Sequence, residues 1–180
     1  MSTATVYDRY PASSVALYNG VTLLHFGVAA AGLVVAFWRW PALGWVLGAV
    51  YLAFALVQMY LIMPLVVCPR CVYRTMSDAR CVSGLNLLSP RFRRPLLHDE
   101  FGRRAEGVFC HNNLYMAALV GPLLLMAPGL VFSFSVAALA LWLGVAALLA
   151  FRYFVVFKRT ACPHCAAKGR CPNAKAMGIS

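Results

Sequence analysis

The chain has few acidic residues, with 5 Asp and Glu against 16 Lys and Arg among 180 residues. This leaves little for acid–base catalysis by paired carboxylates. The sequence also contains no phosphate-binding glycine loop and no Ser-His-Asp arrangement. The common signatures of soluble enzymes are therefore missing.

Apolar residues are abundant instead. They make up 62% of the chain, and the mean hydropathy is +0.75. A soluble globular domain would be nearer half apolar. Because almost all charged residues fall outside the apolar runs, the composition predicts a membrane protein.

Four apolar stretches are long enough to span a bilayer. Residues 14–38 and 43–67 each provide about 25 residues, enough to cross a hydrocarbon core of about 30 Å. The run 114–157 would be roughly 65 Å long as one helix and must fold back, which we expect within residues 127–133. We predict an all-α membrane protein with four transmembrane helices arranged as two hairpins.

The positive charges predict the orientation. The loops between the paired helices hold only Arg39, so the positive-inside rule places both termini and the central loop in the cytoplasm, and the protein in the cytoplasmic membrane as a multi-pass protein. The predicted parts are an interfacial lead (1–13), a first hairpin (14–67), a Cys- and Arg-rich loop (68–111), a second hairpin (112–157) and a Cys-rich tail (158–180). The loop and tail would form a Cys-rich cytoplasmic cap.

A cysteine motif occurs twice, directly after the second and fourth apolar stretches. A Cys-Pro-x-Cys turn places two thiolates together, and a third cysteine follows each turn. A reducing cytoplasm favours metal binding or redox cycling over structural disulfides. Sulfur ligation suits zinc and iron–sulfur clusters about equally. The candidate metal ligands are Cys68, Cys71, Cys81, Cys110, Cys162, Cys165 and Cys171.

The grouping of these ligands stays open. In one arrangement Cys110 completes the first set of three, and a histidine completes the second. The candidate histidines are His98, His111 and His164. In the other, the two turns meet and form one site. That site would consist of Cys68, Cys71, Cys162 and Cys165.

The turns resemble the Cys-Pro-x-Cys knuckles of rubredoxins and zinc ribbons, with Val72 and Ala166 where those proteins commonly have Gly. The Cys171-Pro172 step is similar to the terminal Cys-Pro of bacterial ferredoxins. Four helices with cysteine pairs also resemble quinone-linked membrane thiol oxidoreductases and vitamin K epoxide reductases. Those enzymes carry their loop cysteines on the oxidising side of the membrane, opposite to the orientation predicted here.

Two polar residues inside the spans are candidate ligand-binding residues. His25 and Gln58 each lie about ten residues from the cytoplasmic end of their helix, so both are expected roughly 15 Å deep and able to face each other. Together they would hold a quinone or relay a proton. The alternative is a purely structural interhelical hydrogen bond.

Other features are interpreted more simply. We expect Arg152 to extend to the interface, and the basic run 89–97 to lie on anionic lipid. Gly27 with Ala31, and the pair Gly44 and Gly48, are expected to form close-packing surfaces between helices. No motif supports nucleic-acid binding.

The first function hypothesis is electron transfer between an iron–sulfur or rubredoxin-like centre at the cytoplasmic face and a membrane quinone or partner subunit. The second is an accessory subunit of a membrane complex whose zinc ions only fold the cap. The third is handling of a soft metal or thiol redox chemistry.

Overall fold

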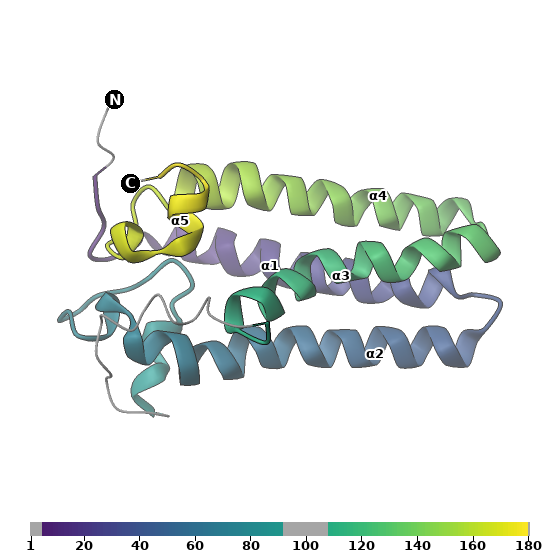
Figure 1. Ribbon diagram of the computed structural model, residues 1–180, viewed down its shortest axis with the longest axis horizontal. Helices are drawn as coiled ribbons and strands as arrows, with labels where there is room; N and C mark the ends of the chain where they lie inside the picture. The colour runs from purple at the N-terminus through teal and green to yellow at the C-terminus, as the bar shows by residue number, and fades with distance from the viewer. Residues whose placement is uncertain (1–4, 92–107, 180) are drawn as a thin grey trace.

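The computed structural model describes residues 5–91 and 108–179, whose regular secondary structure is helical, with two isolated bridges and no strands (Figure 1). Four helices among them are long and apolar enough to span a membrane. The prediction of an all-α chain with four such helices is confirmed. The first is α1 (Ala12–Ala36); the second joins α2 (Pro41–Val57), η1 (Gln58–Val67) and η2 (Cys68–Arg70); the third is α3 (His111–Phe132); the fourth joins α4 (Val136–Phe151) and η7 (Arg152–Ala161).

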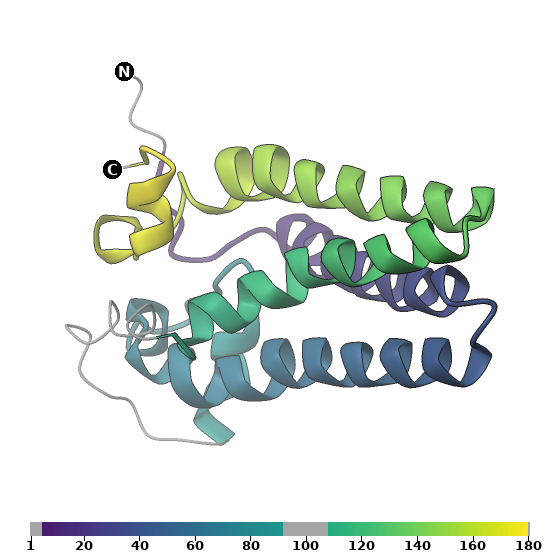
Figure 2. The ribbon, with the colours of Figure 1, turned by 45° about the vertical axis from the view of Figure 1, so that its right-hand side comes forward.

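Short helices follow the second and fourth spans. They are η3 (Val72–Arg74), η4 (Leu85–Leu87), η5 (Ser89–Arg91), η8 (Lys168–Arg170) and α5 (Pro172–Ala176). We call residues 68–91 and 162–176, which hold six of the seven cysteines, the cysteine segments. The turns from α1 to α2 and from α3 to α4 lie at one end of the bundle, whereas both cysteine segments lie at the other (Figures 1 and 2). We call the cysteine-bearing end the cap end.

Helix α1 packs against α2, α3 and α4. Its buried face includes Phe26, Ala29, Leu33 and Ala36, all with no exposed surface. Small residues on this face allow the neighbouring backbones to approach closely, which is how helices gain packing energy in lipid.

Glycines of α2 make such an approach. A Cβ atom at Gly44 would lie 2.8 Å from the Val34 carbonyl oxygen, and one at Gly48 would lie 2.9 Å from Val34 Cγ2. Close packing at this pair is therefore confirmed. The same prediction is wrong for Gly27 and Ala31, because both are exposed and no atom lies within 4 Å of a Cβ built at Gly27.

The turn between the third and fourth spans comes later than expected. Helix α3 continues through Pro122 and Pro128 and ends at Phe132. Proline is tolerated inside membrane helices because neighbouring groups satisfy the released backbone. Ser133 then stabilises the end of α3, donating from Oγ to the carbonyls of Ala36 at 2.8 Å and Gly129 at 2.9 Å.

The second and fourth spans end in the same way. Each changes from α-helix to π-helix for ten residues, η1 and η7, directly before a Cys-Pro-x-Cys turn. The amide of Cys68 donates to the Met63 carbonyl, and the amide of Cys162 donates to the Phe157 carbonyl at 2.9 Å. The two copies of the motif thus share the helix geometry that precedes them, a match that the sequence does not reveal.

Candidate functional site

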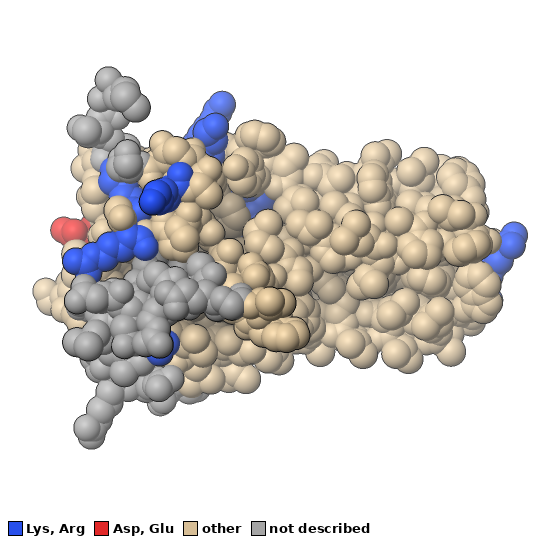
Figure 3. All heavy atoms as spheres, viewed as in Figure 1, with Lys and Arg blue, Asp and Glu red and all other residues tan. Residues whose placement is uncertain are grey.

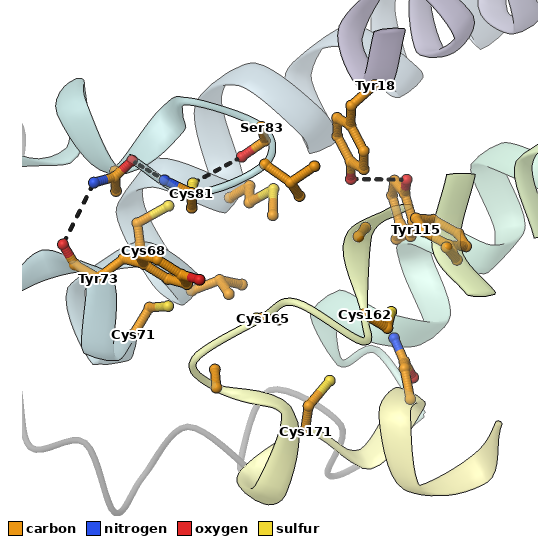
Figure 4. Close-up of a pocket in the computed structure, with 18 of the residues that line it drawn as sticks. Tyr18, Cys68, Cys71, Tyr73, Cys81, Ser83, Tyr115, Cys162, Cys165 and Cys171 are labelled. Atoms are coloured by element: carbon orange, nitrogen blue, oxygen red, sulfur yellow. Dashed lines mark hydrogen bonds between the residues drawn. The ribbon is translucent and has the colours of Figure 1, made fainter. Parts of the chain in front are cut away.

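A cavity of about 160 Å³ lies at the cap end, between the two cysteine segments and the bundle (Figure 4). Both Cys-Pro-x-Cys turns line it, together with the third cysteine of each segment. Six of the seven cysteines therefore surround one space. They are Cys68, Cys71, Cys81, Cys162, Cys165 and Cys171.

The two turns have matching backbone hydrogen bonds. The amide of Cys71 donates to the Cys68 carbonyl at 3.1 Å, and the amide of Cys165 donates to the Cys162 carbonyl at 3.2 Å. The proline after the first cysteine fixes φ and favours this tight turn. Both copies consequently bring their two thiols to the wall of the same cavity.

Asn86 positions the third cysteine of the first segment. Its Oδ1 accepts from the amide of Cys81 at 3.0 Å, and its Nδ2 donates to the carbonyl of Ala79 at 2.8 Å. The thiol of Cys81 lies 3.3 Å from Ser83 Oγ. Sequence reasoning missed Asn86, because a single asparagine in a polar loop gives no signal of burial.

Cys110 is not among the residues that line the cavity. It is the N-cap residue of α3, and its sulfur accepts from the amide of Asn113 at 3.4 Å. The structure thus gives Cys110 a capping position instead of bringing it to the other six cysteines.

The cysteines do not form a ready-made coordination sphere. In residues 5–91 and 108–179, no group of three or more His, Cys, Asp or Glu side chains is arranged to hold a metal ion. All seven cysteines lie in these ranges, and none is part of a disulfide.

The three candidate histidines have different positions. His98 lies outside the described residues. His164 stacks on Tyr7 with ring centroids 4.4 Å apart, and its Nδ1 lies 2.7 Å from the Thr5 carbonyl oxygen. His111 lines the cavity, and its Nδ1 lies 2.7 Å from Gln58 Nε2.

His25 and Gln58 are both buried and both contact α3. Nε2 of His25 lies 3.1 Å from the Leu119 carbonyl oxygen, whereas Gln58 contacts His111 at the start of α3. Gln58 therefore contacts the cavity only through His111, which lines it. His25 is not among the lining residues. His25 Nδ1 and Gln58 Oε1 have no hydrogen-bond partner among the described residues.

The amino-terminal lead connects the two cysteine segments. The amide of Tyr7 donates to the His164 carbonyl at 2.9 Å, and the amide of Tyr10 donates to the Arg80 carbonyl at 2.8 Å. The Arg80 side chain returns two hydrogen bonds to the Tyr10 carbonyl, at 2.9 and 2.6 Å. Residues 5–10 thus hold the segments together, a role that the sequence does not indicate.

Tyr73 reinforces this connection. Its phenol donates to the Tyr7 carbonyl at 2.7 Å and accepts from the amide of Ala166 at 2.9 Å. Tyr10 similarly donates its phenol hydrogen to the Ala161 carbonyl. Burial raises the pKa of Tyr73 and of Tyr10 above the ordinary value of 10.0, so both remain neutral donors.

Arg152 does not extend to the interface as predicted, because its side chain is only 1% exposed. The guanidinium lies 5.2–5.4 Å from the ring centroids of Tyr18, Tyr115 and Phe157, and it donates to the Tyr115 phenol. Cation–π contacts replace part of the hydration that burial removes. The same three aromatic residues line the cavity. The buried Arg152 guanidinium therefore lies on the far side of the aromatic wall of the cavity.

Comparison of the chain with protein-family models, curated proteins and solved structures found no match. The chemistry of the site therefore rests on its own residues. Thiols from two segments around one cavity are suited to binding a soft metal or an iron–sulfur cluster, and to thiol exchange.

Proposed function

We propose that the protein is an integral membrane electron carrier that holds a cysteine-ligated centre, iron–sulfur or rubredoxin-like, in the cavity at the cap end. The centre would exchange electrons with a membrane quinone or a partner subunit. The observation that carries this proposal is the convergence of two Cys-Pro-x-Cys turns, from distant parts of the chain, on one cavity.

The donor chemistry supports this assignment. Cysteine sulfur is the dominant ligand type around the cavity, and thiolates select zinc, copper(I) and iron–sulfur clusters. Since no coordination group is preformed in residues 5–91 and 108–179, the proposal requires the two segments to close on the metal. Metal binding would then be coupled to local ordering of the cap.

We further propose that the four spans form two hairpins with the cap end and both termini in the cytoplasm. Lys and Arg gather around the cap end, whereas the turn between α1 and α2 at the opposite end carries Arg39 (Figure 3). This distribution satisfies the positive-inside rule. The thiols would then face a reducing compartment, where they remain available as ligands.

The test is an ultraviolet–visible spectrum with metal and sulfide analysis of protein purified in detergent without oxygen. We expect sulfur-to-iron charge-transfer absorbance together with bound iron. Replacing Cys68 and Cys162 by Ser should abolish both signals. The matched control is Cys110→Ser, which keeps a good N-cap residue on α3 and removes a thiol outside the cavity.

Other results would redirect the assignment. A colourless protein that binds zinc through the same cysteines would favour the accessory subunit, in which metal only folds the cap. The many short 3₁₀ turns in the cysteine segments are the observation that favours this second function, because such segments gain stability from a metal. No bound metal, or full retention in the Cys68 and Cys162 variant, would contradict the metal proposal.

A further inference from the structure

Two phenols form the side of the cavity that faces the bundle. Tyr18 of α1 and Tyr115 of α3 both line it, and their oxygens are 3.4 Å apart (Figure 4). Both side chains are buried, at 5% and 8% exposure. Arg152 donates from Nη2 to the oxygen of Tyr115.

The two phenols and the Arg152 guanidinium together have more hydrogen-bond donors than acceptors. Arginine has donors only, so the Tyr115 oxygen must act as the acceptor towards Arg152. The contact between the two phenols uses one phenol hydrogen, whichever residue donates. The other phenol hydrogen has no acceptor among residues 5–91 and 108–179. Because a buried donor without an acceptor costs about 1–3 kcal/mol, the pair indicates an acceptor in the cavity.

Arg152 is not among the residues that line the cavity and acts on it through Tyr115. Its Nε and Nη1 are buried without a hydrogen-bond partner in the described part of the chain. A guanidinium that donates to a phenol oxygen also polarises the phenol, so the phenol hydrogen becomes a stronger donor. The group at the cavity wall that lacks an acceptor is thus a polarised phenol hydrogen, which selects an occupant with an acceptor oxygen.

We propose that the phenols of Tyr18 and Tyr115 bind the carbonyl oxygen of a quinone ring in the cavity. Arg152 is the positioning residue that orients and polarises the pair. The rings of Tyr18, Tyr115 and Phe157, with the apolar side chains of Met63 and Val67, form a wall suited to a flat ring.

This inference rests on the proposed function in one respect. The quinone would lie beside the cysteine-lined side of the same cavity and exchange electrons with the proposed cysteine-ligated centre. It also moves the predicted quinone site. His25 is not among the lining residues, and Gln58 is hydrogen bonded to His111, so the phenol pair takes the place of His25 and Gln58 as the carbonyl-binding group.

The experiment measures binding of a short-chain benzoquinone with ¹³C-labelled carbonyls to the purified protein in detergent. Calorimetry gives the affinity, and infrared difference spectroscopy gives the carbonyl stretching band. We expect wild-type protein to shift this band to lower frequency. The double variant Tyr18→Phe with Tyr115→Phe should bind roughly tenfold more weakly and lose most of the shift.

Tyr51→Phe is the matched control. Tyr51 is another buried tyrosine of the bundle, but its phenol donates to the Ala118 carbonyl at 2.9 Å and it does not line the cavity. Its removal should leave both the affinity and the band unchanged. Arg152→Gln should reduce the band shift, and Arg152→Lys should restore part of it, a pattern that a purely structural role would not produce.

Two outcomes would overturn the inference: no quinone binding by wild-type protein, or an unchanged carbonyl band in the double variant. Metal content is measured on the same samples. If the protein contains iron but the carbonyl band of the quinone is the same in wild type and in the double variant, the quinone site alone is refuted. Metal-free protein that binds quinone through the phenols would refute the electron-carrier proposal and retain the quinone site.

Discussion

Tyr73 donates its phenol hydrogen to the carbonyl of Tyr7 across 2.7 Å. The same oxygen accepts from the amide of Ala166 at 2.9 Å. One hydroxyl therefore joins the amino-terminal lead to both cysteine segments, although the three parts are far apart in sequence. Tyr73 also lines the cavity, so the packing of the lead against the two cysteine segments should depend on this hydroxyl.

Replacing Tyr73 by Phe removes the hydroxyl and keeps the ring. The Tyr7 carbonyl and the Ala166 amide lose their partner, so we expect a loss of about 1–3 kcal/mol in the free energy of unfolding. Thermal or denaturant unfolding in detergent measures it. Tyr153→Phe is the control, because Tyr153 is 43% exposed and its hydroxyl makes no hydrogen bond within the described residues. Equal midpoints for the two variants would show that the Tyr73 hydroxyl does not hold the lead and the two cysteine segments together.

Convergence of the cysteine segments can be tested by chemical bridging. In a variant that keeps only Cys71 and Cys165, dibromobimane should link the two thiols within one chain, because both residues line the same cavity. The reagent becomes strongly fluorescent when both of its ends have reacted. Fluorescence and mass spectrometry of the purified monomer therefore report the bridge.

The control for bridging keeps Cys110 and Cys165. Cys110 caps α3 and is not among the residues that line the cavity, so this pair should give little intramolecular product. Similar yields from the two variants would mean that proximity around the cavity does not govern the reaction.

The spans were predictable because long apolar runs have few alternatives to a membrane helix. The end of α3 was not, since proline usually marks a turn, and Pro128 is accommodated here by a helix end held through Ser133. Contacts between helices, absent from any local pattern, decide where that helix stops.

The cysteine motif identified six residues that line the cavity, but sequence spacing could not decide between two separate sites and one shared space. That choice depends on how the helices pack. The position of Arg152 was missed for the same reason, because burial of a guanidinium requires Tyr18 and Tyr115 from other helices. A charge near a helix end otherwise favours the interface.

Helix packing predicts opposite effects for two glycines of α3. A Cβ atom at Gly129 would lie 2.6 Å from the Ala36 carbonyl oxygen, whereas one at Gly121 would meet nothing within 4 Å. Gly129→Ala should therefore destabilise the bundle by about 1–3 kcal/mol through overpacking. Gly121→Ala should be neutral or gain up to about 1 kcal/mol from helix propensity. Unfolding titrated with SDS in mixed micelles compares them, and a neutral Gly129→Ala would contradict the close contact of α1 and α3.

The proposed orientation predicts which end of the bundle a membrane-impermeant maleimide reaches. Lys175→Cys places a thiol on an exposed residue of the tail at the cap end, and Arg39→Cys places one at the exposed turn between α1 and α2. In intact spheroplasts the reagent should modify Cys introduced at Arg39 and spare that at Lys175; in inverted vesicles the pattern should reverse. Peptide mass spectrometry resolves the two sites from the native thiols. Labelling of Lys175→Cys from outside would place the cavity on the oxidising side of the membrane, where thiol exchange would replace metal ligation as the favoured chemistry.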